Sequence, residues 1–304
     1  MAIKNRSKIC LIISAIIIIA ALVLTLCGRG INLGIDFAGG LSMQYDMKTP
    51  VTSADVSAVL DNMGITSSTV TVQGSNNNEA NIRIKEISKD DIQKVQADFE
   101  AGIKAVDPEA VSIGDVNYVG PVAGATLVKN AVISVLLAAA LMLIYIAIRF
   151  DLNSGIAAVF GLLHDVLIML SFMVIFRSVI QMNSSFIAAA LTIVGYSINN
   201  TIVIFDRIRE NAKKMPTGAR EEVTNISIKE SLGRTICTTV TTLITIVALC
   251  ILGVASIREF ALPIIVGILS GVYSANMING YVWAFLEEKR RTRKASGKSA
   301  KAKA

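Results

Sequence analysis

The chain has 304 residues, of which 53% are hydrophobic and 17% charged, and its mean hydropathy is +0.60. That composition is typical of a membrane protein. The formal charge of +6 does not indicate a nucleic-acid partner, because the charges are unevenly distributed along the chain. Residues 28–126 carry seven basic and thirteen acidic side chains, whereas residues 286–304 carry eight basic and two acidic ones. An acidic middle and a basic tail suit opposite sides of a membrane.

The cysteine and histidine content argues against a disulfide framework and a zinc site. The four cysteines all fall in or beside apolar segments, and they are Cys10, Cys27, Cys237 and Cys250. None lies between residues 28 and 126, so no disulfide holds that region together. No Cys/His spacing fits zinc, and we expect neither a metal nor a cofactor.

The N-terminal segment predicts an uncleaved first transmembrane span. Residues 1–8 are basic and are followed by an apolar run over residues 9–27. A signal peptide has the same order, but its apolar run is only ~7–15 residues long and a small-residue cleavage site follows it. This run is longer, and no such site follows.

Five further segments have about the ~20 apolar residues that a bilayer-spanning helix needs. They predict a five-helix membrane domain over residues 127–285, with spans at 128–148, 155–176, 185–205, 236–254 and 261–285. Basic residues are concentrated in alternate connections, whereas the two short loops on the other side hold only Arg177 and Arg258. The positive-inside rule therefore places both termini in the cytoplasm.

Residues 28–126 have the pattern of a small α+β domain outside the cytoplasm. Alternating residues predict strands at 41–47, 68–73, 80–86 and 111–119, with a hairpin turn at 74–78. Capping residues and helical spacing predict helices at 52–64 and 88–106. The order β-α-β-β-α-β is the ferredoxin-like arrangement, which supports many functions and identifies none.

The segment that joins the first span to this domain, residues 28–40, holds five glycines. That content indicates a tight, irregular backbone rather than a helix. Gly39 and Gly40 could suggest phosphate binding, but no P-loop lysine follows them. We interpret the segment as the junction that turns the chain from the membrane into the domain.

Residues 192–211, TIVGYSINNTIVIFDRIREN, begin as an apolar span and end in alternating charges. Their polar members are Tyr196, Ser197, Asn199, Asn200 and Thr201, followed by Asp206 and Arg207. Helical spacing puts Tyr196, Ser197 and Asn200 on one side. Isolated polar residues in a span usually bond a neighbouring helix. At this density a hydrated or ion-handling path is the favoured interpretation.

His164 and Asp165 lie near the middle of the third predicted span. A charged group at that depth costs roughly 2.5–3.5 kcal/mol on insertion scales, which makes it a candidate functional group. The alternative is a neutral pair that bonds a neighbouring helix, since protonation removes most of the desolvation cost. The chain has one histidine, and its place beside an acid favours a proton-responsive role.

Polar stripes are also predicted on the fifth and sixth spans. Arg234, Thr238, Thr241 and Thr245 share one face of the fifth, and we expect that face to pack on the fourth span. On the sixth span, Tyr273, Asn276 and Gly280 share a face, and Gly267 and Gly271 form a G-x-x-x-G pattern that permits close helix contact.

Catalytic chemistry finds no support in the sequence. There is no G-x-S-x-G, no H-E-x-x-H and no pair of acids within a span. The basic tail is best interpreted as topology-setting charge or as an anchor at the anionic inner leaflet. Contact with the ribosome or a nascent chain is an alternative for the tail.

Four motifs in sequence order resemble the SecF family of protein-export membrane proteins. They are NLGIDFAGG (32–40), HDV (164–166), VGYSINNTIVIFDRIREN (194–211) and SIKESLGRTICTTVTTL (227–243). The first contains Gly34, Asp36, Gly39 and Gly40. The resemblance extends from the first span to the sixth and includes the outer domain.

This resemblance implies a six-helix half of a transporter of the RND superfamily, paired with a six-helix partner, SecD, in the bacterial cell membrane. The two subunits would use the proton motive force, or a sodium gradient, to pull unfolded preproteins out of SecYEG. SecA would act on the inner side, with YajC as a further candidate partner. The role involves no enzymatic activity.

One residue departs from the family pattern, because Asn200 stands where the family typically has an aspartate facing the arginine that matches Arg234. Asparagine cannot release a proton, so Asn200 is not itself a titrating group. We therefore expect the ion step to rely on an intramembrane acid of SecD, with Asp165 as a second acid. Either could supply the counter-charge of Arg234.

Two other functions stay open on the sequence alone. One is half of an RND-type exporter of lipids or small amphiphiles, a class that usually has larger outer domains and both six-helix halves in one chain. The other is a scaffold that stabilises the translocon without moving ions.

Overall fold

The structure is a computed structural model that describes residues 3–73, 78–85, 87–113, 116–177, 180–215, 220–253 and 255–301. Within these residues, six helices are long and apolar enough to cross a membrane, and a small antiparallel sheet lies between the first and the second in sequence. The predicted fold class is thereby confirmed. The chain divides into two compact units, one of residues 32–132 with 181–184 and one of the remaining membrane helices.

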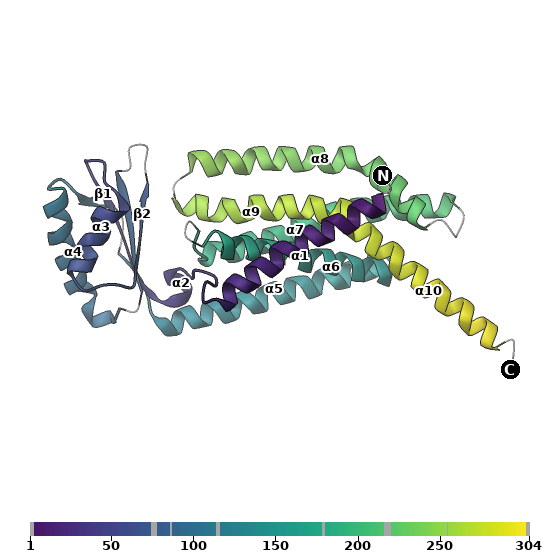
Figure 1. Ribbon diagram of the computed structural model, residues 1–304, viewed down its shortest axis with the longest axis horizontal. Helices are drawn as coiled ribbons and strands as arrows, with labels where there is room; N and C mark the ends of the chain where they lie inside the picture. Colours follow the sequence, from purple (N-terminus) through teal and green to yellow (C-terminus); the bar gives the residue numbers. More distant parts are fainter. Residues whose placement is uncertain are drawn as a thin grey trace. The chain divides into compact units, whose positions relative to one another are not determined.

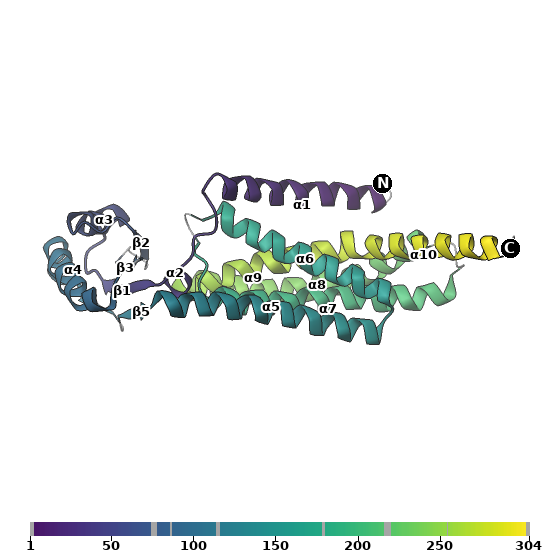
Figure 2. The ribbon, with the colours of Figure 1, turned by 90° about the horizontal axis from the view of Figure 1, so that it is seen from below.

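The membrane unit is a bundle of long helices (Figure 1). Its helices are α1 (Ile3–Leu26), α5 (Pro121–Arg149), α6 (Leu152–Ile175), α7 (Ser184–Lys214), α8 (Arg220–Leu252), α9 (Ala255–Ser274), the π-helical turn η2 (Ala275–Asn279) and α10 (Gly280–Lys301). The helices α8 and α9 lie side by side, and α1 packs on α6 (Figures 1 and 2).

Several helices continue well past the apolar runs that predict them. Polar residues extend α7 to Lys214 and begin α8 at Arg220, where their side chains pair with one another. The last span is interrupted by the π-helical turn η2, after which the backbone stays helical to Lys301. Hydrophobicity predicts the apolar part of a helix but not its polar ends, so each predicted range is short.

Small residues set the close approach of α7 and α9. Gly267 lies directly against the side chain of Ile193, and a Cβ atom on Gly271 would stand 3.3 Å from the Cα of Ser197. The predicted contact role of the G-x-x-x-G pattern is therefore confirmed.

The small unit is a five-stranded antiparallel sheet with two longer helices, α3 and α4, and shorter helical turns. Its elements are the single-turn helix α2 (Ile35–Ala38), β1 (Gly40–Asp46), α3 (Ser53–Asn62), β2 (Ser68–Gln73), β3 (Glu79–Ile84), the 3-10 turn η1 (Lys89–Asp91), α4 (Ile92–Val106), β4 (Val111–Ser112) and β5 (Asn117–Val119). The strand order is β2-β3-β1-β4, with β5 also on β1, as a ferredoxin-like sheet requires. The register pairs Leu41 with Ile84 and Ser68 with Ile84.

Two local predictions for this unit were wrong. The strand predicted over 111–119 is two short strands, β4 and β5, which pair with opposite ends of β1. Residues 35–38, predicted to be irregular, form one helical turn. The glycines of the segment lie on either side of these four residues and not among them. Most of the predicted turn at 74–78 lies outside the described residues.

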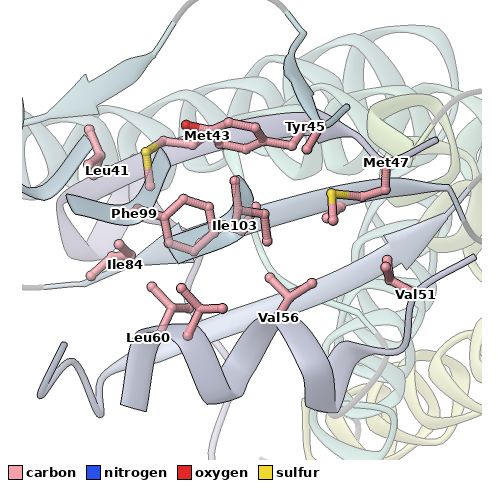
Figure 3. Packing of buried hydrophobic residues seen from close by; sticks show 14 residues of the cluster. Leu41, Met43, Tyr45, Met47, Val51, Val56, Leu60, Ile84, Phe99 and Ile103 are labelled. Atoms are coloured by element: carbon pink, nitrogen blue, oxygen red, sulfur yellow. The ribbon is translucent and has the colours of Figure 1, made fainter. Parts of the chain in front are cut away.

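Alternation along β1 builds the core of this unit. Leu41, Met43 and Tyr45 point to one side of the strand, where Phe99 of α4 and Leu60 of α3 meet them (Figure 3). All five are essentially fully buried, and the rings of Tyr45 and Phe99 lie 5.4 Å apart. The apolar periodicity of the two helices thus accounts for a single closed core.

Candidate functional site

The most deeply buried acid of the membrane unit is Asp165, whose side chain is 0% exposed. It lies on α6 and receives hydrogen bonds from three serine hydroxyls of two neighbouring helices. Ser197 of α7 donates to Oδ2 at 2.5 Å. Ser270 of α9 donates to Oδ1 at 2.7 Å, and Ser274 of α9 donates to Oδ2 at 2.8 Å. The acid therefore joins α6, α7 and α9.

The preceding residue, His164, extends this cluster to α1. Its Nδ1 lies 3.0 Å from Oδ1 of Asp165, and its Nε2 lies 2.7 Å from Oγ of Ser14. Ser14 is itself 3.4 Å from the hydroxyl of Tyr273, which donates to the backbone carbonyl of Cys10. The ring of Tyr273 stacks near that of His164, with centroids 6.0 Å apart.

These contacts explain how a carboxyl group is accommodated inside the bundle. An isolated charge in a low-dielectric interior costs many kcal/mol, so buried acids need donors for their oxygen lone pairs. Three hydroxyls and one imidazole supply four contacts, two to each oxygen of Asp165. The arrangement satisfies both oxygens of one carboxyl group at a buried position.

The polar stretch of α7 is divided between the interior and the surface. Ser197 and Thr201 are buried, and the hydroxyl of Thr201 accepts a 2.8 Å bond from Asn279 of η2. Asn200 is 1% exposed, and its Nδ2 is among the buried groups without a hydrogen-bond partner in the described part of the chain. Asn199 is exposed. The residues predicted to line one ion-handling path are therefore divided between the interior of the bundle and its surface.

Within the described residues, Tyr196 links the middle of α7 to α8. Its hydroxyl lies 3.3 Å from Oγ1 of Thr239. At the end of α7, Asp206 is exposed, and Arg207 pairs with Glu210 and with Glu230 of α8, each at 2.6 Å. Arg207 thus belongs to an exposed ion-pair network and not to the Asp165 cluster.

The polar stripe of α8 faces away from α7, contrary to our prediction. Arg234, Thr238, Thr241 and Thr245 are all exposed. The inward face carries Thr235 and Thr239 instead, which contact Asn276 and Tyr196. Because α8 alternates hydroxyls on two faces, the spacing gave no means of choosing between them.

The glycine junction is held to the loop before α7. Gly34 N–H donates to the carbonyl of Met182 at 2.8 Å, and Asp36 accepts bonds from the amide and hydroxyl of Ser184 at 2.8 and 2.6 Å. Gly39 and Gly40 have φ of 80° and 140°, and a Cβ atom on Gly40 would collide with the carbonyl of Ile84. These values are a physical reason for two successive glycines.

Sequence reasoning missed several partners of the cluster, namely Ser14, Ser270 and Ser274. Ser14 is the one hydroxyl-bearing residue between Ile9 and Leu24, which is a usable signal. Ser270 and Ser274 lie four apart on either side of Gly271, so they share a face. Among the described residues, no group of three His, Cys, Asp or Glu side chains could hold a metal ion.

Comparison with known proteins assigns this architecture to a family. Residues 98–289 match the family described as protein export membrane protein SecD/SecF, C-terminal, and residues 25–51 match the SecD/SecF GG motif. SecF of Thermodesulfovibrio yellowstonii is 39% identical over 246 residues, which cover 80% of each chain. SecF of Rickettsia bellii is 35% identical over 259 residues, covering 85% of this chain and 84% of the relative.

The chain also matches part of longer fused proteins. It is 34% identical over 283 residues to SecDF of Bacillus subtilis, covering 92% of this chain and 37% of that protein. The crystal structure of SecDF from Thermus thermophilus, described as a translocon-associated membrane protein, superimposes with a TM-score of 0.79 at 31% identity, covering 94% of this chain and 38% of that one. The chain belongs to the SecD/SecF family of protein-export membrane proteins, and its full-length relatives are SecF subunits.

Proposed function

We propose that the chain is the SecF-type accessory subunit of the Sec protein translocase. It pairs with SecD in the bacterial cell membrane, with both termini in the cytoplasm, and couples a proton or sodium gradient to the late stage of polypeptide export through SecYEG. SecA and YajC act with the same complex, and the substrate is an unfolded preprotein. The observation that supports this role is the fully buried Asp165 cluster, which links three helices of the bundle and, through His164, a fourth.

A buried acid of this kind is suited to energy coupling and not to bond chemistry. Adding or removing one charge at Asp165 changes the electrostatic energy of the interior by several kcal/mol, because the site is shielded from water. The helices that donate to Asp165 must respond to that change, since their serines bond best to an ionised carboxylate. Ion binding is thereby converted into helix packing.

The exposed stripe of α8 supports a partner of matching polarity. The guanidinium of Arg234 on the outside of a membrane helix is costly if it faces lipid tails, whereas the three threonine hydroxyls already donate to carbonyls of their own helix. The opposite face of α8 exposes Ile236, Val240 and Val247, which suit lipid. A six-helix partner with an intramembrane carboxylate would cover the stripe and supply the counter-charge of Arg234.

Export from membrane vesicles tests this function. Asp165→Asn keeps the size of the side chain and one acceptor oxygen, but it replaces the other oxygen with a donor NH2 group and removes the titration. We expect export driven by an imposed proton or sodium gradient to fall to the level measured without a gradient, while ATP-driven initiation by SecA continues. Ser171→Ala is the matched control, because Ser171 is buried on the same helix. In the described structure its hydroxyl bonds only the backbone carbonyl of Leu167, one turn earlier. Full gradient response in Asp165→Asn would contradict the proposal.

A further inference from the structure

We propose that His164 and Asp165 together hold one mobile proton, and that Ser14 and Tyr273 report its presence to α1. The inference rests on the proposed role of Asp165 as the ion-binding acid of the bundle. It is carried by the directions of the hydrogen bonds in a chain that runs from α9 through α1 to α6.

The direction of each bond follows from a carbonyl that can only accept. The hydroxyl hydrogen of Tyr273 is used on the backbone carbonyl of Cys10. Its Oη can then only accept, so Ser14 is the donor of the 3.4 Å bond between the two hydroxyls. With its own hydrogen used, Oγ of Ser14 must accept the 2.7 Å bond from His164. Nε2 of His164 therefore carries a hydrogen.

The other side of the imidazole requires one more hydrogen. Ser197, Ser270 and Ser274 use their hydroxyl hydrogens on Asp165. The 3.0 Å approach of Nδ1 to Oδ1 needs a hydrogen between them, either on Nδ1 or on Oδ1. The first placement is an imidazolium with a carboxylate, and the second is a neutral imidazole with a neutral acid. Both contain the same number of protons and have no net charge, which is the less costly state of a buried pair. Removal of one proton leaves a single negative charge on Asp165, to which Nδ1 and the three serine hydroxyls donate.

The surroundings of the pair offer little other charge. Among the described residues, Tyr273 of α9 is the titratable group whose ring stacks near His164, and its hydroxyl bonds the backbone carbonyl of Cys10 on α1. The helix α7 faces it with Ser197, and η2 faces α6 through Asn279, which lies against Gly161. On α10, Glu287 bonds Asn153 at the start of α6, about three turns from His164. The net charge of the His164–Asp165 pair therefore depends mainly on the protons that the two side chains themselves hold.

Loss of the proton has a defined consequence for these bonds. The N–H bond at Nε2 breaks, its electron pair stays on the nitrogen, and the proton leaves to water on one side of the membrane. Nδ1 keeps its hydrogen, because otherwise two lone pairs would face each other across 3.0 Å. Bare Nε2 then accepts the hydroxyl hydrogen of Ser14, which must turn away from Tyr273.

The switch therefore acts on the contact between α1 and α9. In the protonated form Ser14 bonds both His164 and Tyr273, and in the deprotonated form it bonds His164 alone. Along the chain, α1 is followed by the glycine junction at residues 28–40. Protonation at α6 is in this way sensed by the helix that leads to the extracytoplasmic domain.

A single-residue measurement tests this switch, because the chain has one histidine. The full-length chain, labelled with 15N-histidine and purified with a tag that contains no histidine, is placed in lipid nanodiscs. The 15N shift of Nε2 then distinguishes a protonated nitrogen from a bare one as the pH is raised. We expect Nε2 to be protonated at low pH and bare at high pH, while Nδ1 remains protonated at high pH.

Variants test whether the protonation of Nε2 depends on the hydrogen bonds of Ser14 with His164 and Tyr273. Tyr273→Phe removes the acceptor of the Ser14 hydroxyl, and that acceptor is used only in the protonated form. We expect the midpoint of the Nε2 change to move by roughly 0.5 pH unit towards acid, as the loss of one weak hydrogen bond predicts. In a Ser14→Ala background, Tyr273→Phe should leave the midpoint unchanged. Tyr281→Phe is the control, because Tyr281 bonds Asn225 of α8 and not the pair.

Each outcome shows, without any measurement of export, whether Nε2 of His164 gains and loses a proton. A nitrogen that stays protonated at every pH at which the protein is folded would overturn the inference, as would one that is always bare. Equal shifts in Tyr273→Phe with and without Ser14 would also overturn it. None of these results bears on whether Asp165→Asn loses gradient-driven export, so the inference and the proposed function fail separately.

Discussion

At the scale of single residues, hydroxyl groups carry much of the organisation of this protein. Asp165 is surrounded by serines, which can donate to a carboxylate or accept from a neutral acid by turning one bond. A lysine or arginine in their place would hold the acid permanently ionised. Serine is therefore the side chain that permits a reversible charge.

Asn200→Asp tests whether titration at α7 has been lost in this chain. The amide of Asn200 is buried and its nitrogen has no partner among the described residues, so a carboxyl group at this position would add a second buried acid. We expect the pH dependence of gradient-driven export to gain a second transition. Asn200→Leu removes the amide without adding an acid and should keep a single transition. A profile that Asn200→Asp leaves unchanged would count against the partner's acid acting in its place.

Asp107 gives the small α+β unit a dependence on acid. The amide of Thr49 donates to its carboxylate at 2.9 Å, and the amide of Glu109 and the hydroxyl of Thr49 add bonds of 3.0 and 2.9 Å. These bonds favour the ionised form and lower the pKa of Asp107 below its usual 3.8. The unfolded chain thus binds the proton more readily, so this stabilisation is present above pH 3.8 and is lost as the pH falls towards the lowered value.

Asp107→Asn should therefore weaken the unit at neutral pH and reduce its loss of stability in acid. The measurement is thermal unfolding of the full chain above and below pH 3.8, followed by proteolysis of the unit. Asp61→Asn serves as the comparison, because Asp61 is an exposed acid at the end of α3. An acid dependence that is the same in Asp107→Asn and the native chain would refute this assignment.

At the scale of elements, the start of α3 is set by a reciprocal cap. The hydroxyl of Thr52 accepts from the amide of Asp55 at 3.3 Å, and the carboxylate of Asp55 accepts from the amide of Thr52 at 2.9 Å. The cap begins the helix that carries Val56 and Leu60 into the core. Local chemistry at two residues thus fixes the position of the core side chains.

Thr52→Ala should destabilise the unit by about 1 kcal/mol, since it removes the acceptor of one helix-terminal amide. Thr52→Ser keeps that acceptor, and serine is at least as favourable an N-cap as threonine, so the unit should lose little stability. Denaturant unfolding of the full chain, followed through protease protection of residues 53–62, measures the difference. Equal losses in the two variants would show that the methyl group, and not the hydroxyl, is responsible.

Elements also show what could be predicted before the structure. Apolar runs located all six membrane helices, and alternation with capping residues located the main strands and both helices of the small unit. The partners of Asp165 could not be predicted, because they depend on the rotation of α7 and α9 about their axes. The outward face of α8 was assigned wrongly for the same reason, since Thr235 and Thr238 carry identical groups on different faces.

At the scale of the whole molecule, the exposed stripe of α8 predicts where a partner binds. A photo-crosslinking amino acid at Thr238 or Thr241 should capture a second six-helix protein in the native membrane. The same group at Val240, which is exposed on the apolar side of α8, should capture it at least several-fold less. Equal capture from both faces, or capture from neither, would contradict a partner seated on the stripe.

The π-helical turn η2, which follows Ser274 directly, has a consequence for the last membrane segment. Such a turn contains one residue more than an α-helical turn, so moving it along the helix by one position rotates the residues it passes by about 100°. The residues of α10 that the turn passes would present a different side to their neighbours, while the rest of the segment keeps its orientation. Migration of the π-helical turn along the helix, and not bending, is therefore the motion we expect of the last membrane segment.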